Sequence, residues 1–441
     1  MQRFLKLSFL ALLVFSVLVA CSKPGASTEP KDEGKKEGEK TPPAQEETVA
    51  IEPEEGASLI MWDNADGEME WAQYVAEEFT KKYDIPVEVQ EVSHVDAAGK
   101  LETDGPAGLG ADVFHAPHDH VGNMVSSGLI LENMFPDEYK ENFMEAAING
   151  TSYTEDGEST LYGYPIAIET YALYYNKDLV EKPATTFEEL FAQAKEFQKD
   201  STDKDRKFGL MMEVGNYYYA HAFLGGYGGY IFGSDNTDPS DVGLNNEGAV
   251  KAGEFMRKYR NELLPLKNED ITADIISSFF NNNQLLYRIS GPWDITNHKD
   301  AGINFGVAPL PKLDNGEVPT SFSGIKGYYV NAYSKYPKAA TLLAQFATSE
   351  EMLAKRFEIT GQIPPHKALL ENDALKADEY AMAFLEQAQS AVPMPNIPEM
   401  QTVWDPMGKA FVSIWNEEVD VKEILDAAAQ QVKDAVASQQ K

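Results

Sequence analysis

The 441-residue chain has a single cysteine, few basic side chains, and no apolar run long enough to span a membrane, since its uncharged run from Leu7 to Ala20 is too short. One thiol excludes a framework of internal disulfide bonds. Lys and Arg number 37 against 71 Asp and Glu, which gives a formal net charge of −34. This acidic excess argues against nucleic acid as a partner and against a basic face that rests on anionic lipid.

The N-terminal segment has the parts of a secretory signal peptide. Arg3 and Lys6 precede the apolar run, and Leu18-Val19-Ala20 leads into Cys21. This junction resembles a bacterial lipobox, which implies cleavage after residue 20 and attachment of lipid to Cys21. The alternative is an ordinary signal peptide with a stray cysteine. We expect a mature chain anchored to the extracellular face of the cell membrane rather than inserted through it.

A polar segment follows the cysteine. Between Ser22 and Ser58 there are five prolines and no aromatic residue. Such a segment cannot bury enough apolar surface to fold. We therefore expect residues 21–56 to form a lipid anchor and a disordered tether.

From residue 57 onward the pattern of apolar residues predicts an α/β fold. Strands are expected at Leu59–Trp62, near Ile85–Val89 and at Ala111–Ala116, and a helix follows the first strand, with one apolar face formed by Trp71, Tyr74, Val75, Phe79 and Tyr83. Consecutive βαβ units predict a parallel sheet. Ligands of open α/β sheets gather at the carboxyl ends of the strands, where this chain carries Asp63–Glu68 and His115–His120.

Three of the seven histidines, His115, His118 and His120, lie within six residues. Imidazole and carboxylate groups are zinc ligands, but the proline inside this run and the lack of a helical histidine pair make the spacing unspecific. We expect a polar loop that lines a cleft, with zinc binding as the alternative.

Three later clusters mix aromatic rings with hydrogen-bonding groups: Asn216–Tyr219, Gly291–Asp294, and Met394–Pro398 followed by Trp404-Asp405. The apolar face of a pyranose stacks on an aromatic ring, and its hydroxyls need carboxylate and amide partners. The clusters therefore favour a sugar ligand. If the tyrosine run is extended, Tyr217 and Tyr219 face away from Tyr218.

Four stretches resemble the maltose and maltodextrin-binding proteins of bacterial ABC importers: Tyr164–Glu169, Tyr175–Asp178, Ile289–Trp293 and Met394–Pro398. They occur in the family's order across about residues 57–437. The resemblance implies a clamp like that of the periplasmic binding proteins, with two discontinuous α/β lobes joined by a hinge. One lobe takes residues 57–167 plus 328–379, and the other takes 168–327 plus 380–441.

The resemblance also implies the residues that hold sugar and the partners of the protein. In the first lobe these are Asn64, Asp66, Asp119 and His120, near the hinge the carboxylate of Glu169, and in the second lobe Asn216, Tyr218, Trp293 and Trp404. The expected partners are a maltooligosaccharide and the permease subunits of an ABC importer in a bacterium without an outer membrane. We expect a monomer that needs no cofactor and no metal.

Four positions depart from the pattern of the family. Gly67 and His120 stand where the best-known member has a lysine and an arginine, Ala116 replaces a tryptophan, and Gly408 replaces another arginine. Smaller groups suggest a wider cleft, so we expect a preference for longer or cyclic α-glucans over maltose.

Two other functions stay open. Glu169 and Asp119 are the carboxylates that a surface glycoside hydrolase would use as acid and nucleophile, although hydrolysis requires a particular distance between them. A receptor for another oligosaccharide is the second alternative. The resemblance favours binding without chemistry.

Overall fold

The computed structural model describes residues 51–439. Cys21, the predicted signal peptide and most of the predicted tether lie outside this range. Residues 51–55 are an exception, because the Glu54 carboxylate accepts hydrogen bonds from the backbone N–H groups of Lys338 and Ala339, each at 3.0 Å. These groups begin a helix, so the acidic side chain satisfies donors that the helix leaves free. The prediction of disorder is therefore wrong for the last residues of the tether.

The first lobe is built on a six-stranded sheet with the order β13-β12-β3-β1-β2, in which β6 also pairs with β12. β1 is parallel to both β2 and β3, which confirms the predicted parallel arrangement, whereas β12 is antiparallel to β3 and β6. The strands are β1 (Leu59–Asp63), β2 (Val87–Glu91), β3 (Val113–Pro117), β6 (Tyr164–Glu169), β12 (Phe322–Val330) and β13 (Val392–Pro393), and a hairpin is formed by β4 (Ser152–Glu155) and β5 (Glu158–Leu161).

Helices of the first lobe cover both faces of this sheet. In α1 three residues of the predicted stripe, Trp71, Val75 and Phe79, have no exposed surface, whereas Tyr74 and Tyr83 are half-buried. The helices are α1 (Asp66–Tyr83), α2 (His94–Asp104), α3 (Val121–Ser126), α4 (Pro136–Asn142), α5 (Glu145–Gly150), α12 (Pro337–Ala347), α13 (Glu350–Thr360), α14 (Lys367–Leu370) and α15 (Asp373–Ala377). Two apolar clusters, one containing Trp71 and the other containing Trp62, form its core.

The second lobe has a four-stranded sheet with the order β11-β7-β10-β8 and one large apolar core. Its strands are β7 (Ala172–Asn176), β8 (Phe208–Met211), β9 (Asp238–Val242, outside the sheet), β10 (Leu285–Ser290) and β11 (Phe305–Ala308). Its helices are α6 (Phe187–Gln198), α7 (Tyr217–Gly226), α8 (Gly233–Asn236), α9 (Glu247–Glu262), α10 (Ala273–Asn281), α11 (Ile295–Asp300), α16 (Glu379–Ala388), α17 (Trp404–Asn416) and α18 (Val421–Gln439).

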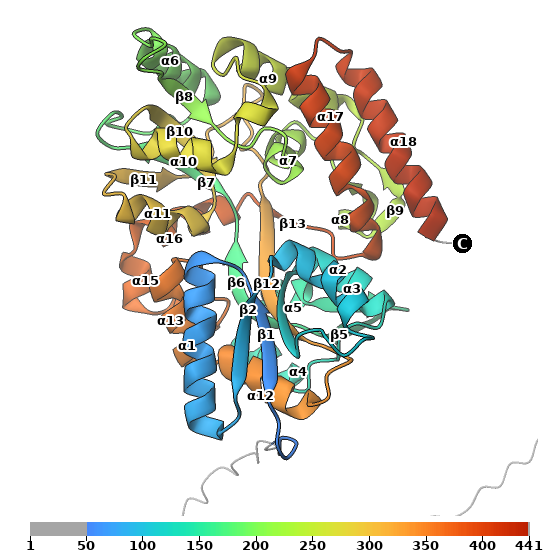
Figure 1. Ribbon diagram of the computed structural model, residues 1–441. Coiled ribbons are helices and arrows are strands. Elements are labelled where there is room, and N and C mark those ends of the chain that lie inside the picture. Colours follow the sequence, from blue (N-terminus) through green and yellow to red (C-terminus); the bar gives the residue numbers. More distant parts are fainter. Residues whose placement is uncertain (1–50, 440–441) are drawn as a thin grey trace, which may run out of the picture. The chain divides into compact units, whose positions relative to one another are not determined.

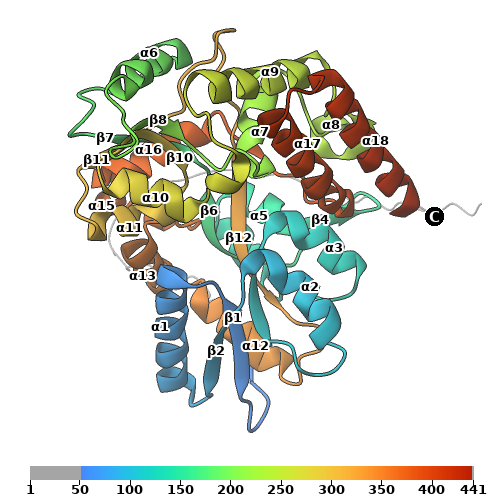
Figure 2. The ribbon, with the colours of Figure 1, turned by 45° about the horizontal axis from the view of Figure 1, so that its top comes forward.

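Two strands connect the lobes. β6 ends at Glu169, and the chain enters β7 of the other sheet three residues later. Along β12, Phe322 packs in the core of the second lobe, whereas Tyr328 and Val330 pack in the first. Figures 1 and 2 show β6 and β12 passing between the two groups of helices and strands. None of the helices within residues 51–439 is long and apolar enough to cross a membrane.

Candidate functional site

A cleft of about 1160 Å³ lies between the lobes, and all nine residues predicted to bind sugar line it. The first lobe contributes groups that follow β1 and β3, together with Glu169, the last residue of β6. The second lobe contributes the start of α7, the short 3₁₀ helix Pro292–Asp294 and the start of α17. The polar side chains thus lie at strand ends, as the rule for open α/β sheets predicts.

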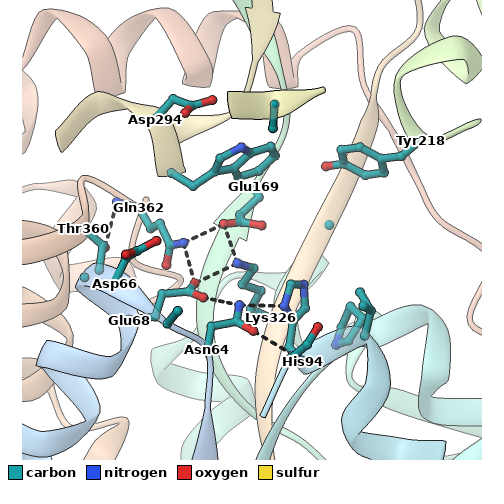
Figure 3. Close-up of a pocket in the computed structure, with 18 of the residues that line it drawn as sticks. Asn64, Asp66, Glu68, His94, Glu169, Tyr218, Asp294, Lys326, Thr360 and Gln362 are labelled. Atoms are coloured by element: carbon teal, nitrogen blue, oxygen red, sulfur yellow. Dashed lines mark hydrogen bonds and ion pairs between the residues drawn. The ribbon is translucent and has the colours of Figure 1, made fainter. Parts of the chain in front are cut away.

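The floor of the cleft is a buried network of charges (Figure 3). Lys326 of β12 places its Nζ atom 2.7 Å from Glu68 Oε1 and 3.0 Å from Glu169 Oε1. Arg356 Nη2 lies 2.9 Å from Glu68 Oε1, and Gln362 Nε2 donates to Glu68 at 2.6 Å and to Glu169 at 2.8 Å. Each of these five residues is at most 8% exposed. Residues from α1, β6, β12 and α13 therefore meet in one interaction.

Opposing influences set the pKa values of this network. Burial alone would raise the pKa of Glu68, but Lys326 foremost, together with His115, Arg356 and His94, holds it well below its usual value. Burial raises the pKa of Glu169, and Lys326 only partly opposes this effect. Burial alone would lower the pKa of Lys326, but the two carboxylates raise it. The charge of Lys326 therefore offsets part of the free-energy cost of burying the carboxylates of Glu68 and Glu169.

Asn64 is a less direct candidate for sugar contact than its position suggested. Its Oδ1 accepts from the backbone N–H of His94 at 2.8 Å, and its Nδ2 donates to Glu68 and to His94 Nδ1, the latter at 2.6 Å. The amide is therefore used to hold His94, whose pKa is lowered well below its usual value by burial and then by Lys326. Asp66 is exposed at the edge of the cleft and has φ of 57°.

Asp119 joins the two sides of the cleft. Its Oδ2 accepts from the indole N–H of Trp404 at 3.1 Å and from Gln401 Nε2 at 3.2 Å. His120 Nε2 lies 3.9 Å from the same oxygen. The carboxylate predicted to hold a hydroxyl thus also bonds to the opposite lobe.

Aromatic rings form the wall that the second lobe presents. Tyr218 and Trp293 lie with their ring centroids 6.4 Å apart, and Trp293 is 36% exposed. Phe322 packs behind both Tyr218 and Trp404, at 5.9 Å in each case. The tyrosine run is helical rather than extended, because Asn216 accepts from the N–H of Tyr218 and caps a helix there. Asn216 itself still lines the cleft.

A second buried ion pair fixes the turn that carries Trp293. Arg288 Nη2 lies 2.7 Å from Asp294 Oδ2, and Arg288 Nη1 donates to Ser277 at 3.0 Å and to His298 Nε2 at 2.8 Å. His298 Nδ1 in turn donates to Asn281 Oδ1 at 2.6 Å. The residue next to Trp293 is therefore tied to β10 and, through Arg288, to α10 and α11.

The three clustered histidines have different partners. His115 Nδ1 faces Asp63 Oδ1 at 2.7 Å, whereas His118 accepts from the N–H of Ile325 and donates to the carbonyl of Met394. The one potential ligand group within residues 51–439 instead combines His115 with Asp63 and Glu68. Since Glu68 is already paired with both Lys326 and Arg356, these residues suit a divalent cation poorly.

Two of the four departures from the family pattern border the cleft. Gly67 and His120 line it, whereas Ala116 has no exposed surface and lies in the core of the first lobe. Gly408 is not among the lining residues. Only the first two positions therefore bear directly on the width of the cleft.

Sequence reasoning missed His94, Lys326, Gln362 and the structural use of Glu68. No motif marks Lys326, which stands in an apolar strand and becomes part of the cleft only because β12 passes between the lobes. A buried lysine is rare unless paired, so its place in that strand is the one available signal. Together the cleft offers buried acceptors on one side and aromatic faces on the other, which fits a ligand with many hydroxyls.

Comparisons with known proteins agree with this geometry. The family described as "Bacterial extracellular solute-binding protein" matches residues 74–383. A galactooligosaccharide-binding protein of Bacillus subtilis (strain 168) is 35% identical over 398 residues, covering 88% of this chain and 92% of that protein. A maltooligosaccharide ABC transporter solute-binding lipoprotein of Streptococcus pneumoniae serotype 4 is 27% identical, covering 97% and 95%.

A solved structure shares both the fold and part of the sequence. It is a cyclo/maltodextrin-binding protein complexed with maltotetraose, 38% identical, with a TM-score of 0.72 over 86% of this chain and 97% of that one. Matches of this extent cover both lobes and not only one of them. The chain therefore belongs to the bacterial extracellular solute-binding proteins, which bind ligands in a clamp of two α/β lobes.

Proposed function

We propose that this protein binds maltodextrins in the cleft and delivers them to the permease of an ABC importer. The observation that carries the proposal is the pairing of exposed aromatic faces on one lobe with buried carboxylates on the other. Asn64, Asp66, Asp119, His120 and Glu169 would serve the hydroxyls, and Asn216, Tyr218, Trp293 and Trp404 would form the opposite jaw. Relatives named for maltooligosaccharides and maltotetraose support the ligand class.

A galactooligosaccharide is the second candidate, because the relative with that name is 35% identical over most of both chains. The two ligands differ in linkage and in the direction of one hydroxyl, and the described residues offer suitable partners for either sugar. The two candidate ligands therefore have to be distinguished by the rank order of their affinities for the protein.

The test is isothermal titration of the purified protein with maltose, maltotriose, maltotetraose, a cyclodextrin and a β-galactotriose. We expect binding to at least one α-glucan, with maltotetraose or the cyclodextrin tighter than maltose if the altered cleft favours longer chains. Equal Kd for maltose and maltotetraose would contradict the length preference. Tight binding of the galactotriose alone would transfer the proposal to the second candidate, and recovery of shortened sugars would replace it with hydrolysis.

We infer lobes of residues 57–167 plus 328–379 and of 168–327 plus 380–441. The separate apolar cores support this division, as do the crossings of β6 and β12. The crossings near Ile168 and Gly324 would form the hinge, together with the segment before Tyr380. A single chain lines the whole cleft, so a monomer would suffice.

We further propose that lipid on Cys21 anchors the protein at the outer face of the cell membrane. The lipobox-like sequence supports this proposal, as does the streptococcal relative that is named a lipoprotein. Labelling of cells with a fatty-acid analogue should mark the wild-type protein but not the Cys21→Ala variant. Equal labelling of both would contradict the anchor.

A further inference from the structure

Lys326 is the lysine that lines the cleft, and no arginine does so among residues 51–439. Lys326 stands on β12 beside β6, where it pairs with Ala167. Gly324, two residues earlier on β12, pairs with Glu169. Because residues two apart on a strand share a face, Lys326 and Glu169 project to the same side of the sheet. Figure 3 shows the ammonium between the carboxylates of Glu68 and Glu169, below the aromatic wall.

The hydrogen bonds of this group leave one donor and one acceptor free. An ammonium has three N–H donors, and two of those of Lys326 are used by Glu68 Oε1 and Glu169 Oε1. Among the described residues, Lys326 Nζ makes no hydrogen bond or ion pair beyond those with Glu68 and Glu169. Glu169 accepts from Lys326 and Gln362 through Oε1 only, so its Oε2 is also available. Both residues line the cleft, and Lys326 Nζ is 5.9 Å from the ring centroid of Trp293.

A neighbouring donor and acceptor match two adjacent hydroxyls of a sugar. One hydroxyl accepts from the ammonium, and the next donates to the carboxylate. Both partners are charged and nearly buried, so a missing hydroxyl would leave an ionised group without a partner. A site that hydrogen-bonds a ligand hydroxyl rejects the analogue that lacks this hydroxyl much more strongly than an apolar pocket rejects a ligand that carries an additional hydroxyl.

We propose that Lys326 is a specificity-determining residue that, together with Glu169, binds a pair of adjacent hydroxyls on one sugar ring. The proposal deepens the sugar-binding function proposed above and rests on it. The proposal also gives the cleft a cation from β12, although Gly67 and His120 stand where the family pattern has a lysine after β1 and an arginine after β3.

The test is titration of the wild-type protein and the Lys326→Met variant with maltotriose and its series of monodeoxy derivatives. We expect the wild type to lose at least tenfold in affinity for the derivatives that lack either hydroxyl of the pair. Lys326→Met should bind the parent trisaccharide about tenfold more weakly and should no longer discriminate against those same derivatives. The surface variant Lys355→Met makes the same chemical change outside the cleft and should behave as wild type.

A buried lysine is also structural, so a second comparison separates the roles. In the double variant Lys326→Met/Glu169→Gln one charge of each sign is removed, which spares the fold an unpaired carboxylate. The single variant Glu169→Gln completes the comparison. If the two residues hold one pair of hydroxyls, the double variant loses no more affinity than whichever of Lys326→Met and Glu169→Gln binds maltotriose more weakly. A Lys326→Met variant that binds maltotriose within twofold of wild type would overturn the proposal. A uniform loss for every derivative would do the same. A wild type that binds no α-glucan would instead refute the function on which the proposal rests.

Discussion

At the scale of single residues, neutral histidines are part of both lobes. The pKa values of His94, His118, His221 and His298 are all lowered, with burial as the largest cause. In each case the imidazole is packed among other side chains, and at His298 both ring nitrogens have partners that fix one neutral tautomer. Such groups resist protonation only while the protein stays folded.

His298 gives a measurable consequence. Burial and then the charge of Arg288 lower its pKa to about 3, whereas an unfolded histidine titrates near 6.5. Below pH 6.5 the unfolded chain therefore binds a proton that the folded chain does not, and stability falls as the pH falls toward 3. This residue alone should cost about 2 kcal/mol between pH 7 and pH 5.

Urea unfolding of the wild type and of His298→Gln at pH 7, 6 and 5 measures this contribution. The glutamine keeps an acceptor for Arg288 but does not titrate. We expect the variant to be less stable at pH 7 and to lose less stability on acidification than the wild type. Parallel pH profiles for the two proteins would show that His298 does not contribute to the acid sensitivity.

At the scale of elements, the turn Pro292–Asp294 depends on β10 for its position. Arg288 on β10 and Asp294 form a pair whose side chains are 3% and 13% exposed. Breaking such a pair leaves a carboxylate without its cation, at a cost of about 3–5 kcal/mol. Because Trp293 directly precedes Asp294, the indole ring of Trp293 should then no longer be held in one position.

Arg288→Met should therefore lower the unfolding free energy by about 3–5 kcal/mol and weaken sugar binding. The double variant Arg288→Met/Asp294→Asn removes the unpaired charge and should recover part of the stability. Thermal unfolding and titration calorimetry at one temperature test both effects. Unchanged affinity in a folded Arg288→Met variant would show that Trp293 keeps its place without this pair.

The same elements show what the sequence predicts and what it does not. The strand around Leu59, the helix with Trp71 and the two later strands follow from local periodicity, and the structure confirms them. The helix that begins at Tyr217 is not predicted from the sequence, because three adjacent tyrosines show no helical periodicity; in the structure the Asn216 side chain caps it. The role of Lys326 could not be predicted, because its partners Glu68 and Glu169 come from two other elements far apart in the sequence.

At the scale of the molecule, the lobes pack around largely separate cores, and hydrogen bonds of Met394 and Asn396 join the second lobe to the first. The bonds from Trp404 and Gln401 to Asp119 cross the cleft between them. Moving one lobe against the other therefore breaks polar contacts but leaves the greater part of both cores intact. This is the condition for a hinge motion in which only the crossing strands change their backbone angles.

Closure on sugar is the prediction that belongs to this scale. A ligand that contacts both jaws binds the closed form more tightly and shifts the population toward it, so its addition should shorten distances between lobes. Spin labels at Glu77→Cys on α1 and Glu196→Cys on α6, in a chain with Cys21→Ser, report that distance by electron double resonance. A second pair, Glu196→Cys and Glu423→Cys on α18, lies within the second lobe and should give one unchanged distance. If maltotetraose binds yet leaves the distance between lobes unaltered, then the clamp is already closed without sugar, and the permease must recognise occupancy by something other than closure.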